Sequence, residues 1–233
     1  MKKSTEDIAC VIKACKVTDA AFKYILPHLI ENVTEKQIVK KIDKFIRKHS
    51  DGLAFKTITA FGENSAEIHH QFPAERKLKK SDIIVLDFGA KINGLCSDMT
   101  RTLFFGKASK KQKDLYLVVL EAQQKAIKYI ESRIKNDELC KASETDKISR
   151  EYLIFKGFPP IPHGLGHGIG RKVHSGLRLS PKSKAYLKSG MIFSVEPGIY
   201  IKGFGGVRIE DTVLITDYGI EILTKSTKEL IEL

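Results

Sequence analysis

Residues 83–102 read IIVLDFGAKINGLCSDMTRT. The first four residues are β-branched or aliphatic, which predicts a buried strand that still continues at Asp87. Asn93-Gly94 follows, and this dipeptide predicts a hairpin because a type I′ turn needs positive φ at both central residues. We therefore expect two antiparallel strands joined by a tight turn.

The predicted turn sets the register of the hairpin. It pairs Ile92 with Leu95, and counting outward from that pair places Asp98 opposite Gly89. Asp87 lies two residues from Gly89, so side-chain alternation directs both carboxylates to one face, with no side chain at Gly89 between them. Two unpaired carboxylates on an apolar face are unfavourable unless a cation lies between them. The stretch therefore predicts a metal site.

Composition limits the class of protein. The chain has 233 residues, enough for one large α/β domain or two small ones, and 42% of them are hydrophobic, enough for a core. The start, MKKSTEDIACVIKAC, lacks the apolar region of a signal peptide, and no apolar run is long enough for a membrane span. The four cysteines are dispersed without a CxxC pair, which indicates reduced thiols in the cytoplasm.

The formal net charge is +12. Such a charge can indicate a nucleic acid, ribosome or anionic membrane as partner. The lysine pairs are scattered, however, without a longer basic block or interleaved aromatic residues; they are Lys2-Lys3, Lys40-Lys41, Lys79-Lys80 and Lys110-Lys111. We interpret the charge as a solvated surface, and expect neither a nucleic acid nor a membrane as partner.

Helix and strand patterns repeat in the same order along the chain. The first set has expected helices at 4–29 and 34–48, a strand at 53–61 and the hairpin at 83–102. The second set has expected helices at 110–135 and 143–155 and strands at 191–201, 206–216 and 220–223. This order predicts two similar halves, each ending in a hairpin with two acids: Asp87 and Asp98, then Glu196 and Glu210.

The acids and one histidine form a coherent ligand set. His167 lies in HGLGHGIG (163–170), which is too glycine-rich for a helix. Taken singly, each of these residues is more often an ordinary turn, strand or loop residue. Together, carboxylate oxygens with one imidazole suit Mn²⁺, Fe²⁺, Co²⁺ or Zn²⁺, and four carboxylates balance two divalent ions.

Five strings in this order carry a resemblance to a known family: ENSAEIHH, LDFGAKINGLCSDMTRT, HGLGHGIGRKVH, FSVEPGIY and VRIEDTVLIT. They resemble the metallopeptidase family of methionine aminopeptidase, aminopeptidase P, prolidase and creatinase, over roughly residues 4–233. The resemblance implies the "pita-bread" α/β (α+β) fold: two pseudo-symmetric halves of helices packed on a curved, mainly antiparallel sheet. It also implies a single catalytic domain at 1–233.

The resemblance assigns the metal ligands of a two-metal site. Asp87 would chelate one ion, Asp98 and Glu210 would bridge both ions, and His167 and Glu196 would complete the other site.

The same resemblance assigns catalytic and substrate-binding residues. His69 and His174 would contact the substrate or stabilise the tetrahedral intermediate. Glu196 would shuttle a proton from the bridging water to the leaving nitrogen. His163 and Arg208 would also bind the substrate, with His163 as a donor near the substrate carboxylate or carbonyl. Both resemble the aminopeptidase P and prolidase branch, where the arginine braces the bridging glutamate. The alternative for Arg208 is an ordinary salt bridge without a role in specificity.

Three features depart from the family pattern. Ser175 follows His174, where relatives usually have Glu or Asp. His70 stands where a small residue is common, so the choice of His69 over His70 rests on alignment. Xaa-Pro relatives usually carry a separate N-terminal domain, and this chain begins almost at the catalytic domain, so we expect that domain to be absent.

We therefore predict a cytoplasmic exopeptidase, monomeric or homodimeric, that hydrolyses N-terminal Xaa-Pro bonds through a hydroxide bridging two metal ions. Carboxylate-rich ligation favours Mn²⁺ over Co²⁺, Zn²⁺ or Fe²⁺. The Xaa-Pro bond is a tertiary amide without an N–H, so a dedicated pocket is plausible. The alternatives are a methionine aminopeptidase and a non-catalytic protein of the same fold that binds RNA or ribosomes.

Overall fold

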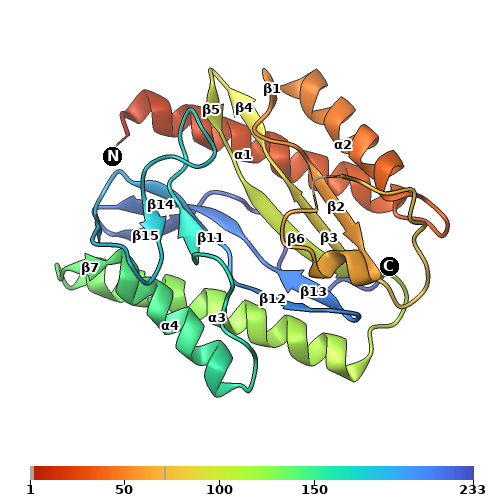
Figure 1. Ribbon diagram of the computed structural model, residues 1–233. Helices are drawn as coiled ribbons and strands as arrows, with labels where there is room; N and C mark the ends of the chain where they lie inside the picture. Colours follow the sequence, from red (N-terminus) through yellow and green to blue (C-terminus); the bar gives the residue numbers. More distant parts are fainter. Residues whose placement is uncertain (1–2, 71) are drawn as a thin grey trace.

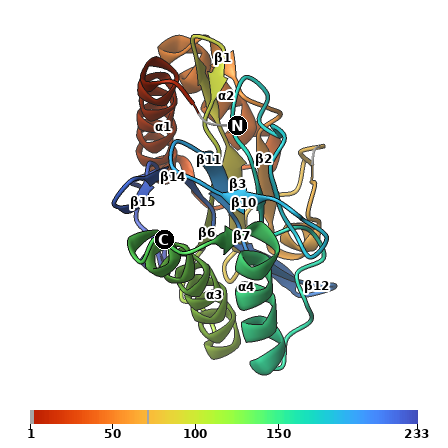
Figure 2. The ribbon, with the colours of Figure 1, turned by 90° about the vertical axis from the view of Figure 1, so that its left-hand side faces the viewer.

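Two pairs of helices enclose the strands of this protein (Figure 1). The computed structural model describes residues 3–70 and 72–233. Helices α1 (Thr5–Ile25) and α2 (Glu35–His49) cover one side, and α3 (Lys110–Lys135) and α4 (Ala142–Phe155) cover the other. The view turned by 90° shows the same layers, with the strands between the helix pairs (Figure 2).

Polar caps define where the helices begin. The Thr34 hydroxyl accepts from the backbone N–H of Gln37, whose side chain accepts from the Thr34 N–H, and the two residues form a capping box. Ser109 and Gln112 form the same arrangement before α3. The first helix ends earlier than expected, because the chain tightens into a 3₁₀ turn, η1 (Leu26–His28), which contains Pro27.

The hairpin of the first half has the predicted register. Strands β2 (Ile58–Phe61), β3 (Ile83–Phe88) and β6 (Met99–Phe104) form one antiparallel sheet, and β1 (Gly52–Leu53), β4 (Ala90–Ile92) and β5 (Leu95–Cys96) form another. Ile92 pairs with Leu95, and Phe88 pairs with Met99, which leaves Asp98 opposite Gly89 as predicted. Asn93 and Gly94 have φ of 50° and 73°, as a type I′ turn requires.

Three predicted strands are interrupted. The strand expected at 53–61 is divided between β1 and β2, and those expected at 191–201 and 206–216 become β11 (Ile192–Val195), β12 (Gly198–Ile201), β13 (Gly205–Arg208) and β14 (Asp211–Thr216). The Glu196 N–H donates to the Leu165 carbonyl at 2.8 Å, and the Glu210 N–H donates to that of Thr100 at 3.1 Å. Because these groups bond to other segments, the strand ladder stops there, and the prediction of continuous strands was wrong.

Each half has an acid in the equivalent position, immediately before a long strand. Asp98 immediately precedes β6, and Glu210 immediately precedes β14. The remaining short elements are η2 (Gly62–Ala66), β7 (Cys140–Lys141), β8 (Gly166–His167), β9 (Arg178–Leu179), β10 (Tyr186–Leu187) and β15 (Gly219–Ile222).

Each half has its own hydrophobic core. One core lies between α1, α2 and the sheet of β2, β3 and β6, and the other lies mainly between α3, α4 and the strands from β11 to β15. Reciprocal hydrogen bonds join the halves: the Thr212 hydroxyl donates to the Asp98 carbonyl, and the Thr100 hydroxyl donates to the Glu210 carboxylate, each at 2.7 Å. The expected two-half arrangement is confirmed, and these bonds lie at its seam.

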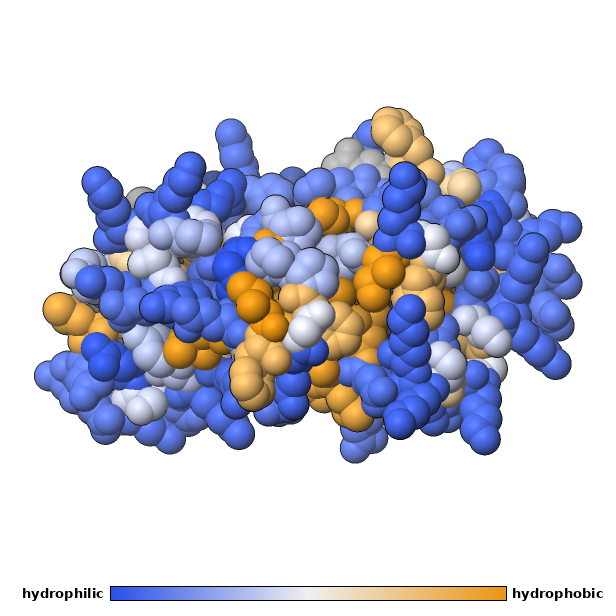
Figure 3. Space-filling model, turned by 60° about the horizontal axis from the view of Figure 1, so that its bottom comes forward, coloured by the Kyte–Doolittle hydropathy of each residue, from blue (hydrophilic) through white to orange (hydrophobic). Residues whose placement is uncertain are grey.

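One face of the molecule is mainly hydrophilic at its margins (Figure 3). Figure 3, in which the lower side of the molecule comes forward, shows hydrophilic side chains around a more apolar central area. Among the described helices, none combines the length and the apolar run that a membrane span requires.

The approach of two strands at Gly89 makes this position intolerant of a side chain. A Cβ at Gly89 would lie 2.0 Å from the Ser97 carbonyl oxygen. We expect Gly89→Ala to lower the free energy of unfolding by about 1–3 kcal/mol, because backbone must move to relieve the overlap. Urea denaturation monitored by circular dichroism would measure the change, and an unchanged midpoint would contradict this packing.

Candidate metal centre and active site

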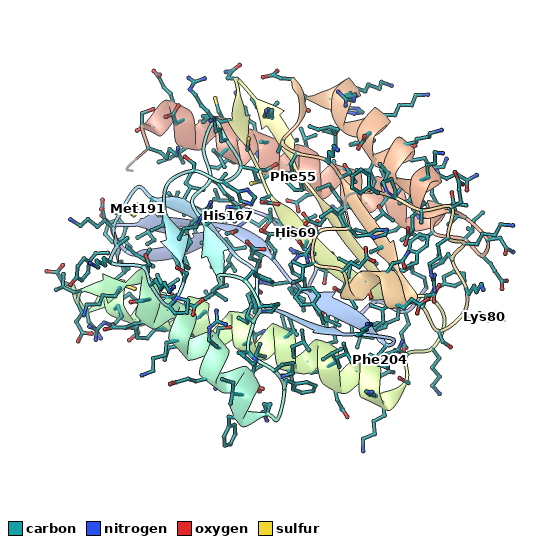
Figure 4. All side chains as sticks on the ribbon, viewed as in Figure 1. Phe55, His69, Lys80, His167, Met191 and Phe204 are labelled. Carbon is teal, nitrogen blue, oxygen red and sulfur yellow. The ribbon has the colours of Figure 1, made fainter. Side chains whose placement is uncertain are left out.

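A cavity of about 300 Å³ lies at the seam between the halves. All nine residues predicted to have a role line it: His69, Asp87, Asp98, His163, His167, His174, Glu196, Arg208 and Glu210. His69 and His167 lie near each other at the centre of the molecule, with Phe55 close by (Figure 4). Ser175 is outside the lining set, and His70 is buried beside α2.

Acids from both halves converge on His167. Ligand atoms of Asp98, His167 and Glu210 lie within 4.8 Å of one another. The Nε2 atom of His167 is 3.1 Å from Glu196 Oε1 and 3.5 Å from Asp98 Oδ2. Glycine makes this convergence possible, because a Cβ at Gly166 would lie 1.9 Å from the Ser194 carbonyl oxygen.

Three carboxylate oxygens at this cluster lack hydrogen-bond partners among residues 3–70 and 72–233. They are Asp87 Oδ1, Asp98 Oδ1 and Glu210 Oε1, and all three are buried. Buried acceptors without donors are strongly unfavourable. Carboxylates and one imidazole are a suitable donor set for Mn²⁺, Fe²⁺, Co²⁺ or Zn²⁺, so the residues fit the metal centre expected from the sequence.

The electrostatics of the cluster favour a cation. Burial, and then the charge of Glu210, raise the pKa of Asp98 well above its usual value. Burial and the charges of Glu196 and Asp87 do the same for Glu210. Burial is the largest single effect and opposes ionisation of Glu196, but the hydrogen bond with His167 and the charges of His167, His163 and Arg208 together outweigh it and lower the pKa of Glu196 to about 2.

Arg208 connects the acids of the two hairpins. Its Nη2 donates to Asp87 Oδ2 at 2.7 Å, and its Nε donates to the Thr100 hydroxyl at 3.0 Å. Thr100 in turn donates to Glu210. The contact of Arg208 with Glu210, the predicted bridging glutamate, is therefore indirect, whereas its contact with Asp87 is direct.

The ring of His163 is already bonded within the protein. Its Nδ1 lies 2.8 Å from the Gly164 carbonyl, which only accepts, so Nδ1 carries the hydrogen. Arg208 donates to the Tyr200 oxygen at 3.0 Å, and the Tyr200 hydroxyl, 2.9 Å from His163 Nε2, then donates to that nitrogen. Burial lowers the pKa of His163, which favours this neutral form. In this arrangement His163 has no free N–H for a substrate.

His69 and His174 are the exposed histidines of the cavity wall. The His174 ring meets the His167 ring edge-on, with centroids 4.2 Å apart. Burial, followed by the charge of His167, lowers the pKa of His174. His69, rather than His70, is the member of the histidine pair that faces the cavity.

Several supporting residues were not found from the sequence. The Gln123 side chain, fully buried on α3, donates to the carbonyls of Val195 and Ile209 at 3.0 and 3.2 Å, immediately before Glu196 and Glu210. The position of Gln123, a polar residue on the apolar face of the helix expected at 110–135, was the sequence feature that could have indicated this role. Two exposed cations, Lys56 and Arg178, also line the cavity, and no local pattern distinguishes them from other surface cations.

Two halves that bring buried acids and a histidine to one cavity form the pita-bread fold. The model of metallopeptidase family M24 matches residues 9–217, and the chain belongs to this family.

Similar proteins have names from the Xaa-Pro branch. The chain is 37% identical over 231 residues to the Xaa-Pro dipeptidase of Pyrococcus furiosus, covering 98% of this chain and 64% of the relative. The structure of a dipeptidase from Pyrococcus horikoshii superposes with a TM-score of 0.94 at 40% identity, over 100% of this chain and 64% of that one. An X-Pro aminopeptidase from Thermotoga maritima gives 0.93 at 33% identity, over 100% and 65%. The chain thus spans about two thirds of the length of these relatives.

Replacing one buried acid should have opposite effects on the stability of the metal-free protein and on its stabilisation by a metal ion. We expect Asp98→Asn to raise the free energy of unfolding of the metal-free protein at pH 7 by about 1–2 kcal/mol, since one pKa unit of repulsion corresponds to about 1.4 kcal/mol. Mn²⁺ at a hundredfold excess over its Kd should stabilise the unaltered protein by about 2.7 kcal/mol, and the variant much less.

Thermal unfolding with EDTA and with Mn²⁺ would measure both effects. The exposed Asp217→Asn provides a matched control that should change neither. A variant that Mn²⁺ stabilises as much as the unaltered protein would exclude Asp98 as a ligand.

Proposed function

We propose that this protein is a metal-dependent exopeptidase that hydrolyses the Xaa-Pro bond at the N-terminus of peptides. The observation that supports this most strongly is a group of three buried carboxylate oxygens that have no hydrogen-bond partner in the described part of the chain. They lie in a cavity whose wall also carries His69 and His174. The names of the relatives, Xaa-Pro dipeptidase and X-Pro aminopeptidase, support the proline specificity.

In this proposal five residues hold two divalent ions: Asp87, Asp98, His167, Glu196 and Glu210. When bound, the ions would supply an activated water and polarise the scissile carbonyl. We propose Mn²⁺ as the native ion because carboxylate oxygens dominate the donor set.

The remaining steps belong to side chains of the cavity. His69 and His174 donate N–H groups to the developing oxyanion. Glu196 accepts a hydrogen bond from the Ser194 hydroxyl at 3.0 Å, and the pKa of its carboxyl lies below the usual value, so it is ionised. It is therefore available to accept a proton and to deliver it to the leaving proline nitrogen.

The cations at the cavity favour short substrates. Lys56 and Arg178 are placed to bind a C-terminal carboxylate, which in an Xaa-Pro dipeptide lies one residue from the scissile bond. We propose dipeptides as the preferred substrates on this basis.

The proposed setting is that of a cytoplasmic, monomeric or homodimeric protein. The free state of all four cysteines supports a reducing compartment. Residues 1–233 are proposed to act as one catalytic unit, supported by a family match that extends over most of the chain.

The proposed activity is tested with metal-stripped protein reloaded with Mn²⁺, Co²⁺, Zn²⁺ or Fe²⁺. We expect release of the N-terminal residue from Ala-Pro and Ala-Pro-Ala but not from Met-Ala-Ser, measured by chromatography. Glu210→Ala should abolish hydrolysis, because it removes a ligand, and Asp217→Ala should leave it unchanged.

Other outcomes would support other functions. Cleavage of Met-Ala-Ser alone would indicate a methionine aminopeptidase. No cleavage with any metal, together with salt-dependent RNA binding, would indicate a non-catalytic binding protein.

Substrate length is tested at Arg178. Arg178→Gln should raise the KM for Ala-Pro about 10-fold or more, because a charge-assisted hydrogen bond contributes about 1.5–3 kcal/mol. The KM for Ala-Pro-Ala amide, which lacks the carboxylate, should change little. Arg171→Gln, an exposed arginine outside the cavity lining, is the matched control. Equal effects on both peptides would contradict carboxylate binding by Arg178.

A further inference from the structure

A histidine outside the cavity lies between two carboxylates. His70 is buried, with 7% of its surface exposed. Its Nε2 is 2.9 Å from Glu35 Oε2, and its Nδ1 is 2.7 Å from Glu67 Oε2. Glu35 is fully buried at the start of α2, whereas Glu67 is mostly exposed in the segment after η2.

The geometry defines the charge of His70. Ionised carboxylates only accept hydrogen bonds, so both ring nitrogens must carry hydrogens and the ring is an imidazolium. The hydrogen bond with Glu35 is the largest cause that raises the pKa of His70 to about 9, against the opposing effect of burial. Burial also opposes ionisation of Glu35, but the bonds from His70 and from backbone N–H groups lower the pKa of Glu35 overall.

Glu35 accepts hydrogen bonds from residues on both sides of His69 in the chain. It accepts from the Phe61 N–H at 2.8 Å, from the Asn64 side chain at 3.0 Å and from the Ala74 N–H at 2.9 Å, besides His70. A carboxylate in the first turn of a helix is also favoured by the helix dipole. The carboxylate of Glu35 thus bonds Phe61, Asn64, His70 and Ala74 to the N-terminus of α2.

His69 depends on this segment for its position. Within 3–70 and 72–233, no hydrogen bond to the His69 side chain is found, although the ring lines the cavity. Its place is therefore determined by the backbone that carries it. The neighbouring residue, His70, is the one that connects this backbone to α2 through Glu35.

We propose that His70 is a positioning residue: the bridge Glu35–His70–Glu67 holds His69 at the wall of the cavity. Its kinetic consequence rests on the proposed peptidase function.

The surrounding charges leave the two carboxylates as the partners of the ring. Arg76, which follows in the chain and whose charge acts on Glu35, forms its own ion pair with Asp82 at 2.7 Å. The pKa of His70 lies above its usual 6.5 when the protein is folded. The stability that the bridge contributes is therefore complete below about pH 6.5 and is lost as the pH rises through about 9.

The charge of His70 can be measured without any activity assay. In ¹⁵N-histidine spectra of the full chain, with and without diamagnetic Zn²⁺, both His70 nitrogens should be protonated at pH 7.5 and titrate near pH 9. The loss of thermal stability in His70→Gln should be largest below pH 6.5 and disappear above pH 9. His49→Gln, an exposed histidine at the other end of α2, is the matched control and should show no such dependence.

Kinetics tests the positioning role. His70→Gln should lower kcat on Ala-Pro about 10- to 100-fold, as a displacement of about 1 Å of a catalytic group does, with little change in KM. Glu67→Gln, which alters only the exposed end of the bridge, should act in the same direction to a smaller extent and lower the His70 midpoint. It serves as the second variant if His70→Gln does not fold.

The outcomes separate this proposal from the proposed function. An unchanged kcat in a folded His70→Gln or Glu67→Gln, or a His70 that is neutral at pH 7.5, would overturn the positioning role. If the unaltered protein cleaves no peptide, the proposed function fails by itself. The His69 ring signals then decide: a shift in His70→Gln supports the positioning role, and unchanged signals overturn it.

Discussion

The repulsion between buried carboxylates at the seam is the constraint on which the rest of this structure depends. Asp87, Asp98, Glu196 and Glu210 face one cavity; Arg208 forms an ion pair with Asp87, and His167 contacts Asp98 and Glu196. Burial and mutual repulsion raise the pKa of Asp98 and of Glu210. A divalent ion would compete with protons for these carboxylates, which would couple occupancy of the centre to pH.

Interrupted strands are how the fold brings these acids together. In a regular ladder, the backbone at Glu196 and Glu210 would bond within its own hairpin. Here Glu196 bonds to Leu165 beside His167, and Glu210 bonds to Thr100 in the other half. At each interruption, the backbone of the acid therefore bonds to a segment that also contributes residues to the cavity or its supporting hydrogen bonds. Gln123 bonds to the carbonyls left at the same interruptions, so α3 stabilises both of them.

The sequence predicted what depends on local chemistry. Asn93-Gly94 determines the register between Gly89 and Asp98 within a few residues, and the motif resemblance selected every cavity acid. The interruptions at Glu196 and Glu210 were missed because their partners are distant in the chain. The environments of His69 and His70 could not be separated for the same reason, since burial of His70 depends on Glu35, 35 residues earlier.

The charge of the centre explains why Arg208 belongs to it. When ionised, the four carboxylates carry four negative charges, and Arg208 compensates one of them by its ion pair with Asp87. Replacing Arg208 by a neutral residue would leave Asp87 without this ion pair. Arg208 thus contributes to the site by its charge as well as by its hydrogen bonds, and that charge reaches Glu210 through Thr100 rather than by contact.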